Sequence, residues 1–161
     1  AGGTPSCRRQ ADERISSEIS VGTALLKPTH YDIATLAEHE PAAFIASPVL
    51  KKTGPIRLPG LDDKSRLFSW WGPNQRQPFF IYGGWWRADY ASPTGLQFND
   101  LFGHSANQEI VNASPAVGLD VGDHVFLRPQ ISESVLLEFG DLLAVRGGRI
   151  VDRWPVFAPT G

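Results

Sequence analysis

Two adjacent glycines near the C-terminus constrain the fold of this chain more than any other feature. Gly147-Gly148 separates two β-rich segments, Leu142–Arg146 and Arg149–Val156. A two-residue turn of type I′ needs positive φ at both central positions, and glycine adopts positive φ without a steric penalty. The pattern therefore predicts a β-hairpin in which Val145 pairs with Ile150.

The segments before this hairpin also have the character of strands. A turn at 121–123 leads into His124–Leu127, which Pro129 ends, and Ser134–Phe139 reads as a further strand. Short runs rich in aromatic or β-branched residues, bounded by turn formers, are typical of strands. The same criterion predicts strands at Phe44–Leu50, Leu67–Trp71, Pro78–Tyr82 and Asn107–Asn112. The chain is therefore expected to be mainly β, with a barrel-like or sandwich-like C-terminal domain.

The first fifty residues have a different character. Ile15–Leu26 ends in a near-continuous apolar run, which suits a strand buried on both faces. Asp32 stands where an N-cap would begin a short helix over Ile33–Glu40. The linker-like segment Lys51–Pro55 then predicts a domain boundary near residue 50.

Composition limits the classes of partner. The formal net charge of -2 is scattered over the chain, so nothing in it attracts nucleic acid or an anionic membrane surface. No apolar run approaches the roughly 20 residues that a membrane-spanning helix needs. The one cysteine, Cys7, excludes an internal disulfide and favours a reducing compartment, so we expect a cytoplasmic protein. The chain contains no methionine and begins in a loop-like Gly-Gly-Thr-Pro-Ser, and we expect it to be a piece of a longer protein.

Aromatic side chains concentrate in residues 68–90. This segment holds four tryptophans, two tyrosines and three phenylalanines. Rings at this density usually fill a core or an interface, because each one buries a large apolar area. The alternative is an exposed platform that binds a ligand or partner, although no basic stripe accompanies it, which disfavours nucleic acid.

Few motifs carry chemistry by themselves. Gly2-Gly3-Thr4 offers backbone N–H groups and a hydroxyl, which hold a phosphate where a turn makes them converge; a flexible terminus is the alternative. Lys27 follows the predicted buried strand and is a candidate amine nucleophile or, alternatively, a surface lysine. None of the histidines has a second ligand at a spacing typical of zinc, and no metal site is expected. The histidines are His30, His39, His104 and His124.

Several motifs together, in chain order, carry a resemblance to a known family. They are Gly3–Ser6, Glu18–Ala24, Lys27–Asp32, Phe80–Gly84, Ser105–Glu109, the turn Val121–Asp123, the strand end Arg128-Pro129 and the segment from Phe139 through Pro155. In this order they resemble the C-terminal part of the fold-type III pyridoxal-phosphate enzymes, in the group of D-threonine aldolase and D-serine dehydratase, related to alanine racemase. The resemblance covers nearly the whole chain.

The resemblance implies a two-part architecture and a cofactor. Residues 1–50 would be the last strand and helix of a (β/α)₈ barrel, and residues 51–161 a C-terminal β-domain. The cofactor would be pyridoxal phosphate, the substrate an amino acid, foremost a D-amino acid, and the assembly a homodimer. The lysine that anchors the cofactor in this family would lie upstream of residue 1.

The resemblance also assigns roles to individual residues. Gly2, Gly3 and Thr4 correspond to the segment that holds the cofactor phosphate. Tyr31 is implied near the substrate, and Asp32 and Glu133 are the candidate catalytic carboxylates.

The chain departs from the family's zinc-binding pattern. Ile131 and Glu133 stand where zinc-dependent members have a histidine and a cysteine or aspartate, and Ile110 replaces the histidine of a Glu-His-Gly motif. Isoleucine has no metal-ligating atom, so zinc is not expected. Racemisation, retro-aldol cleavage and elimination all stay open. The rival interpretation is a free-standing, non-catalytic β-module that binds a ligand or partner through residues 68–90.

Overall fold

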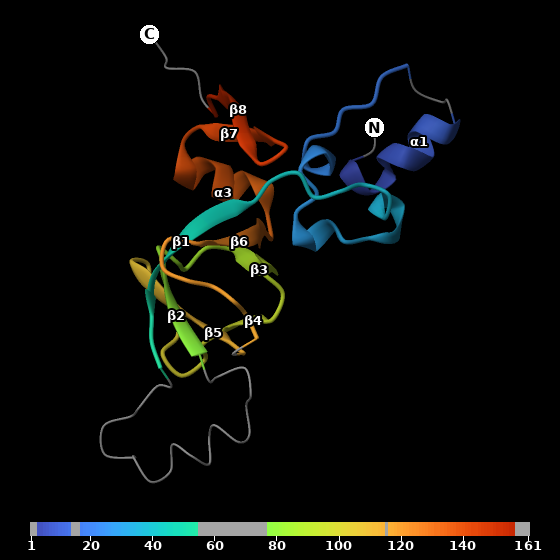
Figure 1. Cartoon of the computed structure of the whole chain (residues 1–161). Coiled ribbons are helices and arrows are strands. Elements are labelled where there is room, and N and C mark those ends of the chain that lie inside the picture. The colour runs from blue at the N-terminus through green and yellow to red at the C-terminus, as the bar shows by residue number, and fades with distance from the viewer. Residues whose placement is uncertain (1–2, 14–16, 55–76, 115, 157–161) are drawn as a thin grey trace. The chain divides into compact units, whose positions relative to one another are not determined.

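The computed structural model describes residues 3–13, 17–54, 77–114 and 116–156 (Figure 1). The chain forms two compact units. The central unit is Phe44–Arg128, and the terminal unit combines Ala1–Ala43 with Pro129–Gly161. The predicted division into residues 1–50 and 51–161 stays a prediction.

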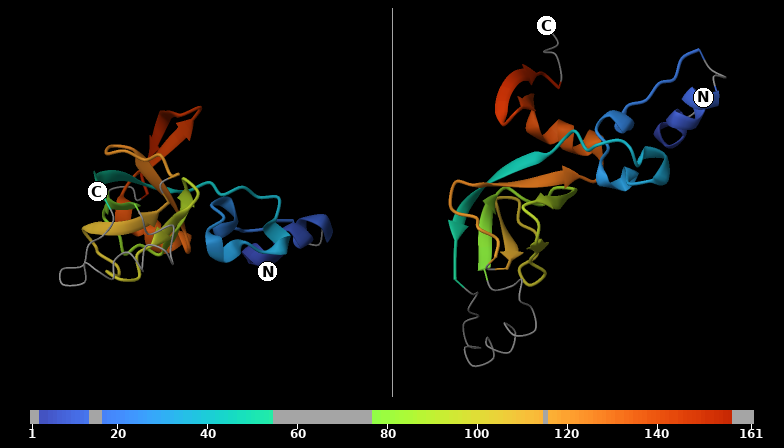
Figure 2. Two further views of the ribbon diagram at one scale, coloured as in Figure 1. Left: turned by 60° about the horizontal axis from the view of Figure 1, so that its bottom comes forward. Right: turned by 45° about the vertical axis from the view of Figure 1, so that its right-hand side comes forward.

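A six-stranded sheet forms the central unit (Figures 1 and 2). Its strand order is β3-β6-β1-β2-β5-β4. The long strand β1 pairs antiparallel with both β2 and β6, while β5 pairs antiparallel with β2 and β4. The strands are β1 (Ile45–Lys52), β2 (Gln77–Tyr82), β3 (Ala88–Ser92), β4 (Leu96–Phe98), β5 (Gln108–Ala113) and β6 (His124–Pro129).

The core of the central unit follows the two-residue period of its strands. In β1, Ile45, Ser47 and Val49 are buried while Ala46 and Leu50 are exposed. The side chains on the buried faces of β2, β5 and β6 complete this core, and Phe79, Ile81, Val111 and Val125 are fully buried. Removing a side chain of this size from water stabilises the fold by roughly 1.5–3 kcal/mol. The strands predicted at Phe44–Leu50, Pro78–Tyr82, Asn107–Asn112 and His124–Leu127 are thus confirmed.

Short helical turns and one hairpin make up the terminal unit. Leu36 is fully buried there. The elements are the 3₁₀ turns η1 (Thr4–Ser6), η2 (Thr23–Leu25), η3 (Thr29–Tyr31) and η4 (Ala34–Leu36), the helices α1 (Cys7–Glu13) and α3 (Ser132–Phe139), and the strands β7 (Leu142–Arg146) and β8 (Arg149–Trp154).

The C-terminal hairpin forms at the predicted turn. Gly147 has φ 56° and Gly148 has φ 74°, the positive values that a type I′ turn requires. Val145 pairs with Ile150, as the glycine pair predicted. The hairpin prediction is therefore confirmed in both its position and its register.

The strand predicted at Ser134–Phe139 is wrong. Ser134–Phe139 belongs to the helix α3, in which Ser132 and Val135 are buried three positions apart, a helical spacing. Glu133 in the first turn also favours a helix start, where a negative charge meets the positive end of the helix dipole. A short apolar run does not by itself distinguish helix from strand.

The N-terminal part of the chain forms less regular structure than expected. The described part of Ile15–Leu26 contains the single turn η2 and no strand, and Lys27, which follows it, has a positive φ of 44°. The predicted helix over Ile33–Glu40 is wrong in extent, because only η4 forms. Asp32 follows η3 as its C-cap and does not cap a helix start. The predicted strand Leu67–Trp71 lies outside the described residues.

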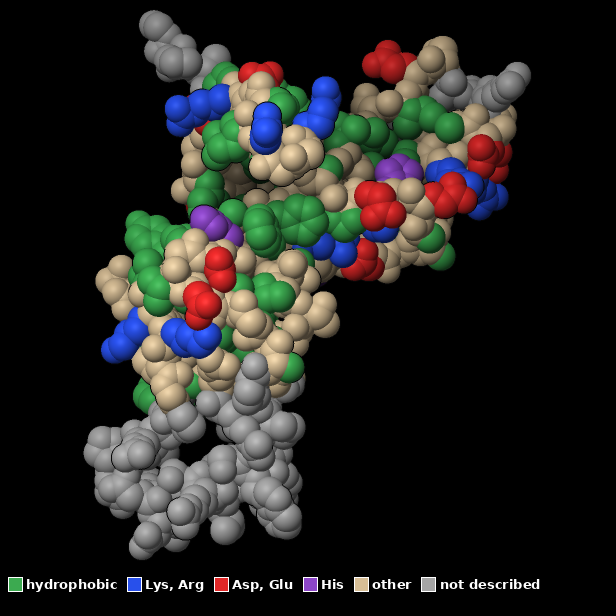
Figure 3. All heavy atoms as spheres, viewed as in Figure 1, with side chains coloured by type: hydrophobic (Ala, Val, Ile, Leu, Met, Phe, Trp, Pro, Cys, Tyr) green, Lys and Arg blue, Asp and Glu red, His purple; other side chains and the backbone are tan. Residues whose placement is uncertain are grey.

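Within the described part of the chain, no helix has the length and apolarity to cross a membrane. On the face of the molecule seen in Figure 3, lysine and arginine side chains lie intermixed with aspartate and glutamate.

Candidate functional site

The candidate phosphate segment begins the terminal unit. Gly2 lies outside the described residues. Gly3 precedes η1 with φ −91°, and Thr4 is buried. Pro5 has no N–H, and the Ser6 N–H donates a 3.0 Å hydrogen bond to the Gly3 carbonyl. Pro5 and Ser6 therefore offer no backbone N–H to a ligand. A Cβ on Gly3 would meet only the Pro5 Cδ at 3.8 Å, so the backbone makes no close approach that requires glycine there.

The described lysines do not provide an anchor for pyridoxal phosphate. Lys27 is buried and its ammonium donates to the backbone carbonyl of His39. Lys52 pairs with a carboxylate at 2.7 Å, and the Lys51 ammonium lies 5.6 Å from the centre of the Phe80 ring. The described residues therefore do not supply the covalent anchor of this cofactor, and no step of its chemistry is assigned to them.

The other residues that the sequence singled out lie in the terminal unit. Tyr31 ends η3 and Asp32 follows it, with the Asp32 N–H donating 3.1 Å to the Thr29 carbonyl. The His30 N–H donates 3.4 Å to the Gln130 carbonyl, so the loop after β6 runs beside η3. Whether Tyr31 and Asp32 act on a substrate stays a prediction.

Glu133 lies in the first turn of α3. Its Oε1 accepts a 3.1 Å hydrogen bond from the Thr23 hydroxyl. Its pKa is lowered, chiefly by its own backbone N–H and also by the Thr23 and Ser132 hydroxyls, while desolvation acts in the opposite direction. Glu133 is thus held as a carboxylate, and its catalytic role stays a prediction. Among the described residues, no group of three or more His, Cys, Asp and Glu side chains could hold a metal ion.

A buried carboxylate organises a second cluster, in the central unit. Glu109 lies on β5 and is 4% exposed. Its Oε1 accepts a 2.7 Å hydrogen bond from the Tyr90 hydroxyl of β3, and its Oε2 accepts one of 3.0 Å from the Trp85 N–H. The Nδ1 of His104 lies 2.8 Å from the same Oε2. A buried charge is stable only when it is fully hydrogen-bonded, and these three groups supply the donors.

Two glycines shape the backbone around this carboxylate. Gly83 (φ 75°), Gly84 (φ 135°) and Trp85 (φ 56°) all have positive φ. A Cβ on Gly84 would lie 2.2 Å from the Ser105 carbonyl oxygen and 2.6 Å from the Glu109 Cβ. Glycine is therefore required for the chain to pass over Glu109 and to direct the Trp85 N–H at it. A tryptophan at positive φ is strained, and strain of this kind is concentrated at functional sites.

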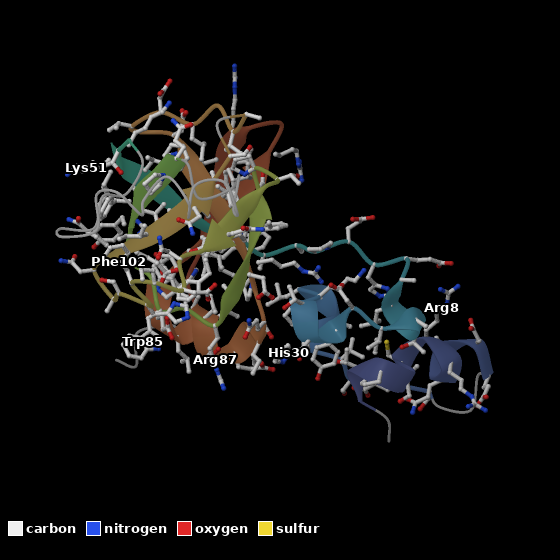
Figure 4. The ribbon with its side chains drawn as sticks, turned by 90° about the horizontal axis from the view of Figure 1, so that it is seen from below. Arg8, His30, Lys51, Trp85, Arg87 and Phe102 are labelled. Atoms are coloured by element: carbon white, nitrogen blue, oxygen red, sulfur yellow. The ribbon has the colours of Figure 1, made fainter. Side chains whose placement is uncertain are left out.

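The imidazole of His104 lies among aromatic rings. The Phe98 ring centre is 4.1 Å from that of His104, and the Trp85 ring centre is 6.2 Å away with the planes 22° apart. Trp85 is 69% exposed and His104 about half exposed. Figure 4 shows Trp85 and Phe102 at the periphery of the central unit.

The phenol of Tyr90 stays protonated beside Glu109. Burial raises its pKa, and the hydrogen bond to Glu109 and the charge of Glu109 raise it further. The phenol therefore keeps its proton and remains a donor to Glu109.

The sequence interpretation missed this cluster, because it treated His104 as isolated. Five positions separate His104 from Glu109, and this spacing does not place two side chains side by side in a regular strand or helix. The available signal was a glycine pair, Gly83-Gly84, between aromatic residues, together with a glutamate at the start of an apolar strand.

Comparison with known proteins supports the fold. No protein-family model matches the chain, and a search among curated proteins gives no significant match. Among solved structures, the chain is similar to the crystal structure of D-threonine aldolase from Filomicrobium marinum, with a TM-score of 0.67 and 15% sequence identity. The similarity covers 96% of this chain and 39% of the aldolase, so the chain spans well under half the length of that protein. The chain therefore has the mainly β fold that the sequence predicted, consistent with the C-terminal part of a D-threonine aldolase-like enzyme.

Proposed function

We propose that these residues are the C-terminal part of a pyridoxal-phosphate-dependent enzyme that acts on amino acids, foremost D-amino acids. The observation that carries this proposal is the similarity to a D-threonine aldolase over 96% of the chain at a TM-score of 0.67. The ordered motifs from Gly3–Ser6 to the C-terminal hairpin support it independently of the structure.

In this proposal the cofactor's lysine anchor belongs to a part of the protein outside these residues. Gly2, Gly3 and Thr4 would contact the phosphate once the cofactor is held by that other part. Tyr31, Asp32 and Glu133 would lie near the substrate, and two copies of the protein would assemble as a homodimer. The free cysteine Cys7, half-buried on α1, fits a cytoplasmic protein.

Whether the enzyme performs racemisation, retro-aldol cleavage or elimination depends on its proton-transfer groups. The positions where zinc-dependent members have ligands carry Ile110, Ile131 and Glu133 here. A reaction without zinc is therefore proposed. D-threonine is the first substrate to test, because it distinguishes aldol cleavage, which gives acetaldehyde, from elimination and from epimerisation at Cα.

The experiment is to isolate the native polypeptide that contains this sequence and to measure its intact mass, its absorption spectrum and its action on D-threonine. The 161 residues weigh 17.6 kDa. A barrel of roughly 250 residues predicts a polypeptide heavier by about 20–25 kDa. We expect that mass and an absorption band that borohydride abolishes. A native polypeptide of 17.6 kDa without such a band would contradict the proposal.

The rival interpretation, a binding module built on residues 68–90, is weaker. Residues 68–76 lie outside the described part of the chain, and Phe79 is fully buried in the core. Phe79 therefore stabilises the sheet, whereas Tyr82 and Trp85 of the same segment are exposed.

A further inference from the structure

Trp85 and His104 together expose an aromatic surface on the central unit. The Trp85 indole is 69% exposed, and its ring centre lies 6.2 Å from that of His104. We call the exposed faces of these two side chains the Trp85–His104 surface. The buried Glu109 accepts a hydrogen bond from the Trp85 backbone N–H and contacts the His104 ring.

The hydrogen bond to Glu109 determines which nitrogen of the imidazole carries a hydrogen in the neutral ring. An ionised carboxylate can only accept, so the His104 Nδ1 carries a hydrogen and donates it. In the neutral ring the Nε2 then holds a lone pair. Within the described residues, the bond to Glu109 is the one hydrogen bond that the structure records for this ring. The Nε2 is thus available to accept a hydrogen bond from a ligand.

The charge of the cluster favours a cation. Tyr90 and the Trp85 backbone add no positive charge to Glu109, so the cluster carries one net negative charge whenever the His104 ring is in its neutral form. Its carboxylate is 5% exposed, and charges interact more strongly in such a setting than in water. The indole ring adds its own attraction, because tryptophan is the best aromatic partner for a cation.

We propose that the Trp85–His104 surface binds ligands that carry a primary ammonium group. One N–H of the ligand donates to the His104 Nε2, and its positive charge lies against the Trp85 ring. Glu109 is the positioning residue: it fixes the tautomer of His104 and supplies the negative charge behind the imidazole. This proposal rests on the central unit alone and does not require the cofactor-dependent activity.

Arg87 offers a test of whether the Trp85–His104 surface binds a cation or an anion. It is exposed, lies two residues after Trp85 and extends away from the ribbon in Figure 4. A guanidinium two residues from Trp85 is expected to repel an ammonium group and to attract a carboxylate. Arg87→Ala should therefore strengthen the binding of an amine, whereas it would weaken the binding of an anion.

The experiment is an NMR titration of the protein with propylammonium, with 1-propanol as the neutral control. At about pH 8 an ordinary amine is charged and an ordinary imidazole is neutral. We expect propylammonium to shift the His104 and Trp85 ring signals saturably, and propanol to leave them unchanged. His104→Asn and Trp85→Ala should weaken the binding by about threefold or more.

Two variants separate a binding role from a structural one. Glu109→Gln keeps an oxygen that accepts from His104 but removes the charge, and should weaken amine binding by a similar factor in a protein that is folded by circular dichroism. His124→Asn, on the exposed start of β6, is the matched histidine control and should bind as the unmodified protein does. Unsaturable shifts, equal shifts with propanol, unchanged binding in His104→Asn or weaker binding in Arg87→Ala would each overturn the proposal.

Discussion

The hydroxyl of Tyr90 donates a 2.7 Å hydrogen bond to the buried carboxylate of Glu109, and this bond links strands β3 and β5. These two strands are not neighbours in the sheet order. The bond therefore connects two strands that are not joined to each other by the backbone hydrogen bonds of the sheet. It also leaves Glu109 with a full set of donors when those of Trp85 and His104 are added.

Tyr90→Phe should destabilise the protein by about 1.5–3 kcal/mol, because it removes a hydrogen bond to a charged, buried acceptor. Urea unfolding at neutral pH measures this difference. Tyr82→Phe is the control, since Tyr82 is 59% exposed and its hydroxyl makes no hydrogen bond recorded in the described structure. Equal effects of the two substitutions would show that the bond to Glu109 contributes little.

Stability should fall as the pH rises above about 10, and Tyr90 should be a cause of it. The pKa of Tyr90 is raised in the folded protein, so the folded state keeps a proton that the unfolded state releases above its ordinary pKa. The contribution is fully present below the unfolded pKa and is lost as the pH approaches the folded one. Unfolding curves between neutral pH and about pH 11 measure the decline, and Tyr90→Phe should make it shallower. If the free energy of unfolding of Tyr90→Phe declined as steeply with pH as that of the unmodified protein, the effect would not come from Tyr90.

Gly84→Ala should destabilise the central unit by more than about 2 kcal/mol, through overpacking and backbone strain together. The added Cβ would lie 2.2 Å from the Ser105 carbonyl oxygen at a φ of 135°. Gly118→Ala is the matched control, because nothing lies within 4 Å of a Cβ there. The midpoints of urea unfolding compare the two variants, and a Gly84 variant as stable as the Gly118 variant would refute the close approach.

Gly147→Ala should loosen the C-terminal hairpin, while Gly147→Asn should be tolerated. Position 147 has φ 56°, which costs an alanine about 1 kcal/mol and an asparagine less. Because a two-stranded hairpin is only marginally stable, this difference should speed amide hydrogen exchange in β7 and β8 by roughly fivefold. Equal exchange rates in the alanine and asparagine variants would exclude the type I′ turn.

The pKa of Glu133 should lie below its ordinary value, and Thr23→Ala should raise it only part of the way. The Glu133 backbone N–H is the largest cause of the lowering and remains in that variant, while the Thr23 hydroxyl is lost. Carbon-13 NMR of the side-chain carboxylate during an acid titration measures both values. A Glu133 pKa that Thr23→Ala leaves unchanged would show that the 3.1 Å contact is not maintained in solution.

Local sequence signals predicted those elements that short-range chemistry specifies. The strands β1, β2, β5 and β6 were predictable from alternation and β-branched or aromatic content. α3 was mistaken for a strand, because the six residues of Ser134–Phe139 are too few for periodicity to decide. The strand predicted at Ile15–Leu26 failed for a related reason: its described residues end just before Lys27, which has a positive φ, and they pair with no strand.

By itself the sequence determined the mainly β character of the chain and the position and register of its last hairpin. The reason is that glycine at two adjacent positions permits a backbone turn which other residues resist. Only the tertiary structure decided that Glu109, Tyr90 and His104 form one cluster. Their contacts depend on which strands become neighbours and on the passage of Gly84 over Glu109, and neither is recorded in the spacing of residues along the chain. A buried carboxylate requires donors, and the fold brings them from three separate segments.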